Sequence, residues 1–547
     1  MEPEEVPYGP WREQYCAKEE DLARQKNHKF SYCPKISVVV PAYRTPEIFL
    51  RQMIESLEKQ SYENWELVIG NASPEDETMA RILKEYTGKD PRVKNVPIPE
   101  NIGIAENTNA ALAAAAGNFV GFMDHDDLLA PDALFEIAIR LEKDPSIDAF
   151  YTDEDKVRTD LSEYFQPHFK PDFNLDLLRS NNYICHFSMF DADLLKKTGL
   201  FRSEYDGSQD HDMVLRLTER AEKIVHVPKV LYYWRMHNNS VAQNLDSKSY
   251  AVDAAIRAVS GQLVREHESG KVGSSLPFRT IYKVDYDIIN TPLVSIVVHN
   301  CKSEKQIKDT VERIFEVTDY KNIEIIYLFN KTCKTIQIKL ENNSKVKWIE
   351  CKNYSDAEEW NLGVQSAHGE YIVLMDVKCR PANSRWLDEM LMFAQREDVV
   401  TVGPKIYYRD RSVAYAGIAL SKKKKSGLYW LCQYNTIDEI GYEGMLCHAR
   451  DTSASMAGCM MFKKKNWEEN QKFDSCMGKL ADIDFCLKGS RNHKLNVWTS
   501  YSEILYTGEN LIPETGDSEI SAFKNEWKEE IVKETYCHPM WEKLGLV

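Results

Sequence analysis

The sequence lacks the cysteine patterns of a zinc site or of a disulfide framework. Its 13 cysteines are scattered over 547 residues, with neither a Cys-x-x-Cys pair nor a zinc-type Cys/His spacing. The count is odd, and the first residues are acidic and include no apolar stretch typical of a signal peptide. We therefore expect reduced thiols, most of them small core residues, in a cytoplasmic protein.

A membrane-spanning run and a basic surplus are also missing. The longest stretch of small and apolar residues, 110–123, is interrupted by Gly117 and Asn118. It falls short of the roughly 20 residues that cross a bilayer. The formal net charge is −16, whereas binding to nucleic acid phosphates needs concentrated Lys and Arg. The sequence thus predicts no transmembrane segment and no nucleic acid partner.

A cluster of carboxylates is the most informative feature that is present. Asp124, Asp126 and Asp127 follow residues 118–123, an apolar segment that we interpret as a short buried strand. Closely packed carboxylates repel one another, and a divalent cation such as Mg²⁺ or Mn²⁺ would relieve that repulsion. The alternative is a helix N-cap, because Asp127 and Asp132 both precede a helix expected to begin near Pro131. The cluster alone favours neither interpretation.

The chain contains an internal repeat. The strand-like residues 36–40 and 62–67 recur as 294–298 and 320–325, each 258 residues later. The segment that ends in Asp124 recurs 252 residues later and ends in Asp376. Strand patterns alternate with helical patterns, which is typical of a largely parallel α/β sheet. We expect an N-terminal helical extension and two tandem domains joined by a linker: 1–35, 36–270, 271–290 and 291–547.

Several motifs together resemble family 2 glycosyltransferases of the GT-A fold. They are Ile-Ser-Val-Val-Val-Pro-Ala-Tyr at 36–43, Asn-Ile-Gly at 101–103 with Asn109 and Ala110, and Asp-His-Asp-Asp at 124–127. Residues 207–216 resemble the Glu-Asp-x-Asp motif of the family's catalytic base, with Gln209 in place of the Glu. Residues 232–240 resemble its Tyr-x-Arg-x-His-x-x-Ser segment, whose His approaches the metal and the donor diphosphate.

This resemblance implies roles for individual residues. Mn²⁺ or Mg²⁺ would be held by Asp126, Asp127 and His237. Asp210 would be the base that activates the acceptor hydroxyl, although a helix-capping Asp is the structural alternative. The nucleotide-sugar donor, a UDP- or dTDP-sugar, would contact Pro41, Ala42, Tyr43, Asn71, Asp124 and Arg235. The acceptor, a glycan or lipid-linked glycan, would lie near Asp153, Glu154, His186 and Asp212.

The second copy departs from the pattern. It has Asp376 and Lys378 where the first has Asp124 and Asp126, so a fixed positive charge replaces one of the metal acids. Asp482 preserves the position of the base, whereas residues 506–509 contain no His. A metal-free transferase that uses Lys378 in place of the cation, a degenerate domain that holds the acceptor, and a structural partner all remain open; we favour the degenerate or acceptor-binding domain.

Residues 151–156, Tyr-Thr-Asp-Glu-Asp-Lys, and 182–187, Asn-Tyr-Ile-Cys-His-Phe, resemble blocks of one subgroup. This subgroup is that of bacterial two-domain transferases of polysaccharide assembly, often rhamnosyltransferases. We therefore predict an inverting, metal-dependent glycosyltransferase that extends a bacterial cell-surface glycan, with catalysis in the first domain. A bifunctional polymerase that uses both domains and a non-catalytic glycan-binding scaffold are the alternatives. Lys422 to Lys425, with Tyr429 and Trp430, are placed in a solvated loop rather than against lipid headgroups, so peripheral membrane contact is the less favoured interpretation.

Overall fold

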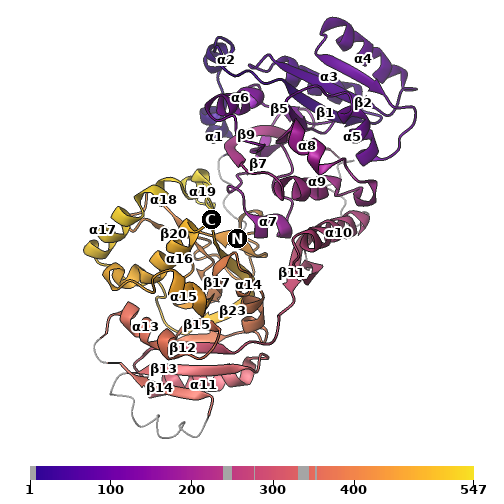
Figure 1. The fold of residues 1–547 in the computed structure, drawn as a ribbon. Coiled ribbons are helices and arrows are strands. Elements are labelled where there is room, and N and C mark those ends of the chain that lie inside the picture. Colours follow the sequence, from indigo (N-terminus) through magenta and orange to yellow (C-terminus); the bar gives the residue numbers. More distant parts are fainter. Residues whose placement is uncertain (1–7, 238–248, 276–277, 330–343, 352–353, 547) are drawn as a thin grey trace. The chain divides into compact units, whose positions relative to one another are not determined.

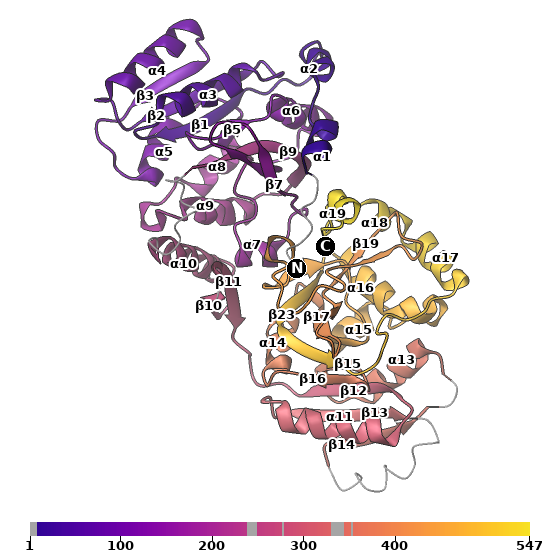
Figure 2. The same cartoon turned by 180° about the vertical axis from the view of Figure 1, so that it is seen from behind.

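The computed structural model describes residues 8–237, 249–275, 278–329, 344–351 and 354–546 (Figure 1). The chain divides into two compact units. The first comprises Met1–Phe173, Asn181–Glu268 and Leu276–Thr280, and the second comprises Asn174–Ser180, Ser269–Ser275 and Ile281–Val547. In each unit the helices pack around a mixed sheet (Figures 1 and 2). The α/β class predicted from the sequence is confirmed.

The first unit is built on one sheet with the strand order β3-β2-β1-β4-β8-β6-β9-β5, and β7 pairs with β6. Its strands are β1 Ile36–Ala42, β2 Trp65–Asn71, β3 Val93–Pro97, β4 Phe119–Phe122, β5 Leu128–Leu129, β6 Ala149–Arg158, β7 Tyr164–His168, β8 Ser188–Asp191 and β9 Ile224–Met236. Its helices are α1 Tyr8–Tyr15, α2 Glu19–Lys26, α3 Glu47–Glu58, α4 Glu77–Lys89, α5 Ile104–Leu112, α6 Ala133–Lys143, α8 Ala192–Thr198, η1 Ser203–Tyr205, α9 Gln209–Thr218 and α10 Ser249–Arg265.

The central strand β1 explains where a ligand has access. It pairs in parallel with β2 on one side and with β4 on the other. Val38, Val39 and Val40 are fully buried, as expected for a parallel strand covered on both faces. The strands β2 and β3 follow on one side of β1, and β4 lies on the other side. The strand order therefore reverses at β1, and the carboxyl ends of β1 and β4 flank this topological switch point, where open α/β sheets bind their ligands.

The second unit repeats this sheet strand for strand, with the order β14-β13-β12-β15-β22-β17-β23-β16. Its main strands are β12 Val294–Cys301, β13 Ile323–Phe329, β14 Val346–Glu350, β15 Tyr371–Asp376, β16 Cys379–Pro381, β17 Val399–Tyr407, β22 Cys459–Lys463 and β23 Leu495–Tyr506. Shorter strands are β18 Val413–Tyr415, β19 Ile418–Leu420, β20 Leu428–Trp430 and β21 Arg450–Thr452. The helices are α11 Glu304–Val317, α13 Asp356–Ser366, α14 Trp386–Ala394, η5 Tyr442–Gly444, α15 Lys464–Glu469, η6 Ser475–Leu480, α16 Ala481–Arg491, α17 Asp517–Glu526, α18 Lys528–Val532 and α19 Pro539–Leu544.

Two stretches differ from the predicted domain plan. The predicted linker, 271–290, contains β11 Phe278–Tyr286 and most of β10 Gly270–Ser275, which form a two-stranded sheet. Helix α7 Leu175–Ser180, placed in the first domain by the sequence, belongs to the second unit. There the carboxylate of Asp176 forms an ion pair with Arg396 at 2.6 Å. In the N-terminal extension the described residues contain two short helices, α1 and α2, where the sequence indicated one.

Within the ranges that the structure describes, no helix combines the length and the apolar character needed to cross a membrane.

Candidate active site

The three clustered acids lie together at the carboxyl end of β4. Asp124, Asp126 and Asp127 each offer one carboxylate oxygen, and these oxygens all lie within 4.8 Å of one another. The short strand β5 follows at once and pairs with β9, with Leu128 opposite Tyr233. This pairing brings the end of β9 beside the acids. A set of carboxylates at this spacing suits Mg²⁺ or Mn²⁺, which prefer oxygen ligands.

Asp127 anchors the loop that carries the acids. Its carboxylate is 1% exposed and accepts a hydrogen bond from the Tyr232 hydroxyl at 2.6 Å and another from the Arg235 backbone N–H at 2.7 Å. Burial, together with the neighbouring Asp126 and Asp124, raises the pKa of Asp127 well above its usual range. These bonds join the acid loop to β9, so the side chain does not cap α6. Asp132 occupies the N-cap position of α6 and makes no capping hydrogen bond.

His237 and Asp126 meet at the open side of the cluster. The imidazole Nε2 lies 2.6 Å from Asp126 Oδ2, and the two side chains are 18% and 21% exposed. The ring of His237 packs beside Phe49, with 5.3 Å between ring centroids. The structure therefore brings together an imidazole nitrogen and a carboxylate, both predicted as metal ligands, that lie 111 residues apart in the sequence.

Arg235 is hydrogen-bonded to the backbone of the acid loop. Its guanidinium Nε donates to the backbone oxygen of Asp126 at 2.6 Å, and Nη1 donates to that of Thr159 at 2.8 Å. The side chain is fully buried, with the guanidinium 4.5 Å from the Phe49 ring centroid. Its Nη2 is buried and has no hydrogen-bond partner among the described residues. The contact of Arg235 with the donor diphosphate, which the resemblance implied, stays a prediction.

His186 lies next to the acids. Its Nε2 is 3.5 Å from Asp124 Oδ2, and its ring stacks on Tyr232 at 4.8 Å with an interplanar angle of 14°. Burial acts to lower the pKa of His186, but the contact with the Asp124 carboxylate acts against burial and raises that pKa. Burial acts to raise the pKa of Asp124, but His186 outweighs it and lowers that pKa. Each of the two groups thus favours the charged form of the other.

Asp210 lies in the first turn of α9, and its hydrogen bonds leave the helix. Its Oδ2 accepts from Asn182 Nδ2 at 2.9 Å and from Cys185 Sγ at 3.1 Å. Burial raises the pKa of Cys185 to about 12, so the thiol stays protonated and donates. These contacts favour the orientation of a functional carboxylate over a capping role. The loop 182–187 thus links Asp210 to the acid cluster through His186.

The predicted nucleotide contacts lie along the adjacent strand ends. Pro41 is opposite Gly70, and Ala42 is opposite Asn71, in the β1–β2 register. Tyr43 follows, with 38% of its surface exposed. Asn71 is buried, and its Oδ1 accepts from the Ser73 backbone N–H at 3.0 Å. The edge therefore presents Tyr43 to a ligand and uses Asn71 to shape the turn.

The acid loop is tied directly to this edge. His125 Nδ1 lies 3.0 Å from the Thr45 hydroxyl, and Thr45 follows closely after β1. Sequence reasoning assigned no role to Tyr232, Asn182, Cys185 or this pair. Tyr232 and residues 182–187 lie in motifs on which the resemblance is based. That membership was the signal in the sequence that could have indicated a role for them.

Three of the predicted acceptor residues are engaged in buried ionic contacts. Asp153 Oδ1 lies 2.9 Å from both the Lys170 N–H and His226 Nε2, and its side chain is fully buried. Glu154 forms an ion pair with Lys170 at 3.1 Å. Asp212, also fully buried, forms ion pairs with Arg202 and Arg216. Asp153 and Asp212 are therefore closed to solvent as the structure stands, and the predicted acceptor role of the three carboxylates stays a prediction. His186 remains at the site.

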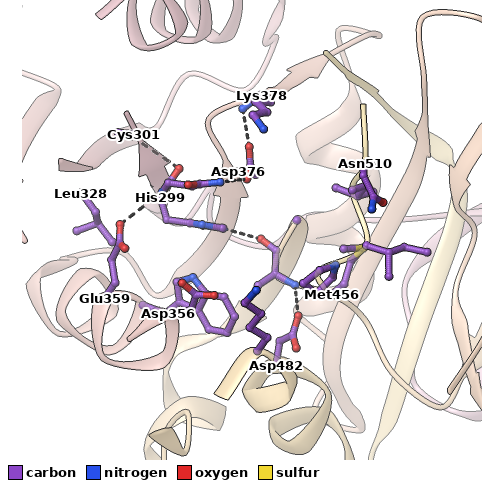
Figure 3. A pocket seen from close by; sticks show the side chains of 18 of the residues that line it. His299, Cys301, Leu328, Asp356, Glu359, Asp376, Lys378, Met456, Asp482 and Asn510 are labelled. Atoms are coloured by element: carbon purple, nitrogen blue, oxygen red, sulfur yellow. Dashed lines mark hydrogen bonds between the residues drawn. The ribbon is translucent and has the colours of Figure 1, made fainter. Parts of the chain in front are cut away.

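The second unit has a cavity of about 470 Å³ at the same sheet edge (Figure 3). Asp376, Lys378 and Asp482, the three residues singled out in the second copy, all line it. Asp482 Oδ2 accepts from the Ala457 N–H at 2.7 Å, and burial raises the pKa of Asp482 to about 6. The predicted equivalence with Asp124, Asp126 and Asp210 stays a prediction.

Comparisons with known proteins agree with this duplicated site. The model of the family described as "Glycosyl transferase family 2" matches residues 37–199 and 294–449. The protein y4gI of Sinorhizobium fredii is 34% identical over 86% of this chain and 53% of its own length. The O-antigen biosynthesis protein RfbC of Myxococcus xanthus is 31% identical over 74% of this chain and 32% of its own length. The chain thus spans about half, or less, of these curated relatives.

Among solved structures, S. aureus TarS in complex with UDP-GlcNAc is 21% identical, with 42% of this chain and 66% of that chain covered and a TM-score of 0.36. The family model covers more than half of the chain and matches both units. In both units it includes the central parallel strands and the loop that follows them. On this ground the chain belongs to glycosyl transferase family 2.

Proposed function

We propose that the first unit transfers a sugar from a nucleotide-sugar donor to a glycan acceptor with inversion at the anomeric carbon and with a divalent metal. The observation that carries this proposal is the placement of Asp126, His237 and Asp210 around one sheet edge, linked through the loop 182–187. Family membership supports glycosyl transfer itself. The metal, the stereochemistry and the substrates are the parts proposed here.

Asp126 and His237, as predicted, would hold Mn²⁺ or Mg²⁺ at the mouth of the cluster. We place Asp124 there instead of the predicted ligand Asp127, because both oxygens of Asp127 accept hydrogen bonds from β9. The ion would neutralise charge on the departing diphosphate. Asp127, held by Tyr232 and the Arg235 backbone, fixes the loop that presents these ligands. Support by residues behind the ligands is typical of metal sites and keeps the ligands correctly oriented.

Asp210 is the proposed general base. Inversion requires a base that removes the proton of the acceptor hydroxyl on the side opposite the leaving group. The hydrogen bonds from Asn182 and Cys185 both reach Oδ2 of Asp210. They leave Oδ1 for the acceptor and fix the orientation of the carboxylate. Direct transfer then needs no covalent enzyme intermediate.

The proposed substrates are a UDP- or dTDP-sugar and a growing surface polysaccharide, which is lipid-linked in this proposal. The name of the relative RfbC assigns that protein to O-antigen biosynthesis, and 74% of this chain aligns with it. This similarity supports a polysaccharide acceptor. The proposed place of action is the cytoplasmic face of the cell membrane, which fractionation of the native host would test.

Donor turnover tests the proposal. The purified protein is incubated with UDP-, dTDP- and GDP-sugars and Mn²⁺ or Mg²⁺, and the released nucleoside diphosphate is quantified with and without a chelator. We expect chelator-sensitive release from one donor, which Asp126→Ala abolishes. Asp193→Ala removes an exposed carboxylate on α8 that pairs with Lys196 and serves as the matched control. Donor binding without any turnover, even with glycan acceptors added, would instead favour the scaffold alternative.

The stereochemistry is measured on the product. NMR of the new glycosidic bond shows whether its anomeric configuration is opposite to that of the donor. Retention of the donor configuration would contradict the role given to Asp210.

A further inference from the structure

A buried ammonium group lies beside the loop 182–187. The side chain of Lys170 is fully buried, although lysine is almost never fully buried in folded proteins unless it is paired. Lys170 follows shortly after the end of β7, and its backbone N–H donates to Asp153 Oδ1 at 2.9 Å. Taking an ammonium group out of water is costly. The contacts that offset this cost therefore show what the group is placed to hold.

One partner of the ammonium is a carboxylate on β6. Lys170 Nζ donates to Glu154 Oε2 at 3.1 Å, and Glu154 is 8% exposed. The His168 imidazole lies 3.4 Å from the other oxygen of this carboxylate, Oε1. Burial acts to raise the pKa of Glu154, but Lys170 and His168 act against it and lower that pKa to about 2. Glu154 thus stays ionised at neutral pH and fixes the position of the ammonium.

The other two partners are backbone oxygens on either side of Cys185. Lys170 Nζ donates to the His186 oxygen at 2.5 Å and to the Ile184 oxygen at 3.4 Å. A lysine ammonium has three N–H donors, and the two oxygens and the Glu154 carboxylate use all of them. Because the two oxygens flank Cys185, the ammonium fixes the direction of the backbone at that residue.

That stretch of backbone carries two side chains of the candidate active site. Cys185 Sγ donates to Asp210 Oδ2 at 3.1 Å, and His186 Nε2 lies 3.5 Å from Asp124 Oδ2. Each contact depends on the direction in which the side chain leaves the backbone. A rotation of the peptide groups at 185 and 186 would therefore move both side chains away from their partners. Lys170 lies behind the site and reaches the acids through this loop.

Stabilisation of the fold alone would not require this ion pair. Apolar side chains of similar volume often stabilise a protein as well as a buried ion pair does. A buried network of charges and hydrogen bonds, in contrast, specifies one arrangement of its members, because other arrangements leave polar groups unpaired. Two of the three partners of the Lys170 ammonium belong to one loop. The network is thus suited to orient that loop.

We propose that Lys170 is a positioning residue for the reaction. Its ammonium, fixed by Glu154, holds the loop 182–187 in one conformation. That conformation directs the Cys185 thiol to Asp210, the proposed base. The inference rests on the proposed function and deepens it, because it names a residue that supports the base from outside the set of groups that touch the substrates.

Two measurements on the full chain test the inference. Amide hydrogen exchange of residues 182–187, read by mass spectrometry, reports how firmly the loop is held, and donor turnover reports the reaction. The variant is Lys170→Met with Glu154→Gln, which removes both charges and leaves neither of them unpaired. We expect exchange in the loop to become about tenfold faster or more and kcat to fall about tenfold or more, with donor affinity unchanged in calorimetry.

Two single variants assign the effect to the ammonium. Glu154→Gln leaves the ammonium on the loop and should retain more of kcat than the double variant. Lys170→Arg keeps the charge but spreads its donors over a planar fork, so it should loosen the loop and lower kcat in smaller measure. Because Lys170→Arg leaves the charge of Glu154 paired, it also provides the test if the double variant does not fold.

A second background separates orientation from a general loss of structure. In Cys185→Ala the thiol that donates to Asp210 is already absent. The Lys170→Met and Glu154→Gln substitutions should therefore lower kcat by a much smaller factor there than in the parent. A loss of folded protein would lower kcat by the same factor in both backgrounds.

Lys229→Met is the matched control. It removes an ammonium that pairs with the buried Glu136 of α6 at 2.6 Å in the same unit, and it should change neither loop exchange nor kcat. The inference is overturned if the double variant exchanges as slowly as the parent, if kcat is unchanged although the loop loosens, or if kcat falls equally in both backgrounds. Absence of turnover in the parent would instead contradict the proposed function, and the exchange rates would still decide whether Lys170 holds the loop.

Discussion

The hydroxyl of Tyr232 provides a sharp test of how the acid loop is held. Tyr232→Phe removes the 2.6 Å hydrogen bond to Asp127 Oδ2 and keeps the ring. It also removes the oxygen that accepts the Asp124 backbone N–H at 3.3 Å. A hydrogen bond to a charged group contributes about 1.5–3 kcal/mol, and the buried Asp127 would keep no substitute for it. Loss of comparable support behind metal ligands weakens metal binding by about 10–100-fold.

The assay is donor turnover as a function of Mn²⁺ concentration. We expect the half-saturating Mn²⁺ concentration of Tyr232→Phe to rise by about 10–100-fold, with activity largely restored at high metal. Tyr151→Phe is the control, because it deletes an equally buried hydroxyl that donates to the Pro171 backbone oxygen at 2.7 Å, outside the cluster. An unchanged Mn²⁺ dependence in a folded Tyr232→Phe protein would refute the reasoning.

Three further predictions concern the first unit. Asp210→Asn keeps the shape of the side chain but removes the base, and should lower kcat by about 10²–10⁴-fold with donor binding unchanged by calorimetry. Glu66 is 1% exposed, and two lysines, a hydroxyl and a backbone N–H counter its burial and lower its pKa to about 2. Its ionised form therefore adds about 3 kcal/mol to the free energy of unfolding. This contribution is present above about pH 4.5 and is lost as the pH falls towards 2. Glu66→Gln should therefore make the free energy of unfolding depend less on pH in this range. Gly70→Ala places a Cβ 2.9 Å from a backbone oxygen of α5 and should lower stability by about 1–3 kcal/mol in thermal unfolding.

The sequence predicted those features that depend on local pattern and on repetition. The buried run 36–40 and its copy 258 residues later specify two central strands, and the structure extends the correspondence to all eight strands of each main sheet path. The acid cluster was visible because Asp124, Asp126 and Asp127 are adjacent in the chain. His237 was found through its motif, although 111 residues separate it from Asp126.

Partners from distant segments were the part that could not be predicted. Asp153 and Asp212 carry the same chemistry as the site acids in the sequence, and only the fold reveals their contacts with His226 and Arg202. Arg235 is buried where β9 pairs with β6, opposite Val157 and over the ring of Phe49, and the sequence does not show these contacts. The place of helix α7 in the second unit depends on contacts such as the ion pair of Asp176 with Arg396, which its short sequence does not encode.

The second unit has no counterpart of the buried hydrogen bond between Tyr232 and Asp127, because both positions carry other residues. Cys379 stands in the place of Asp127, and the register of β16 with β23 puts Ile504 in the place of Tyr232. Both are fully buried, and Cys379 Sγ donates to the Gly458 oxygen at 3.1 Å. Replacing only one partner leaves a buried polar group without its hydrogen bond, which costs about 1–3 kcal/mol, and more for a charged group. The two changes are therefore expected to be coupled.

A double-mutant cycle measures that coupling. Cys379→Asp alone should destabilise the second unit by about 3 kcal/mol or more, because the new carboxylate is buried beside an isoleucine. Adding Ile504→Tyr supplies the hydroxyl that Tyr232 supplies in the first unit and should recover about 1–2 kcal/mol. Ile406→Tyr, at a fully buried position on the neighbouring strand β17, is the control for the volume added by the ring. If the double variant is no more stable than the sum of its single variants predicts, the hydroxyl and the carboxylate are not coupled, and the two losses in the second unit need separate explanations.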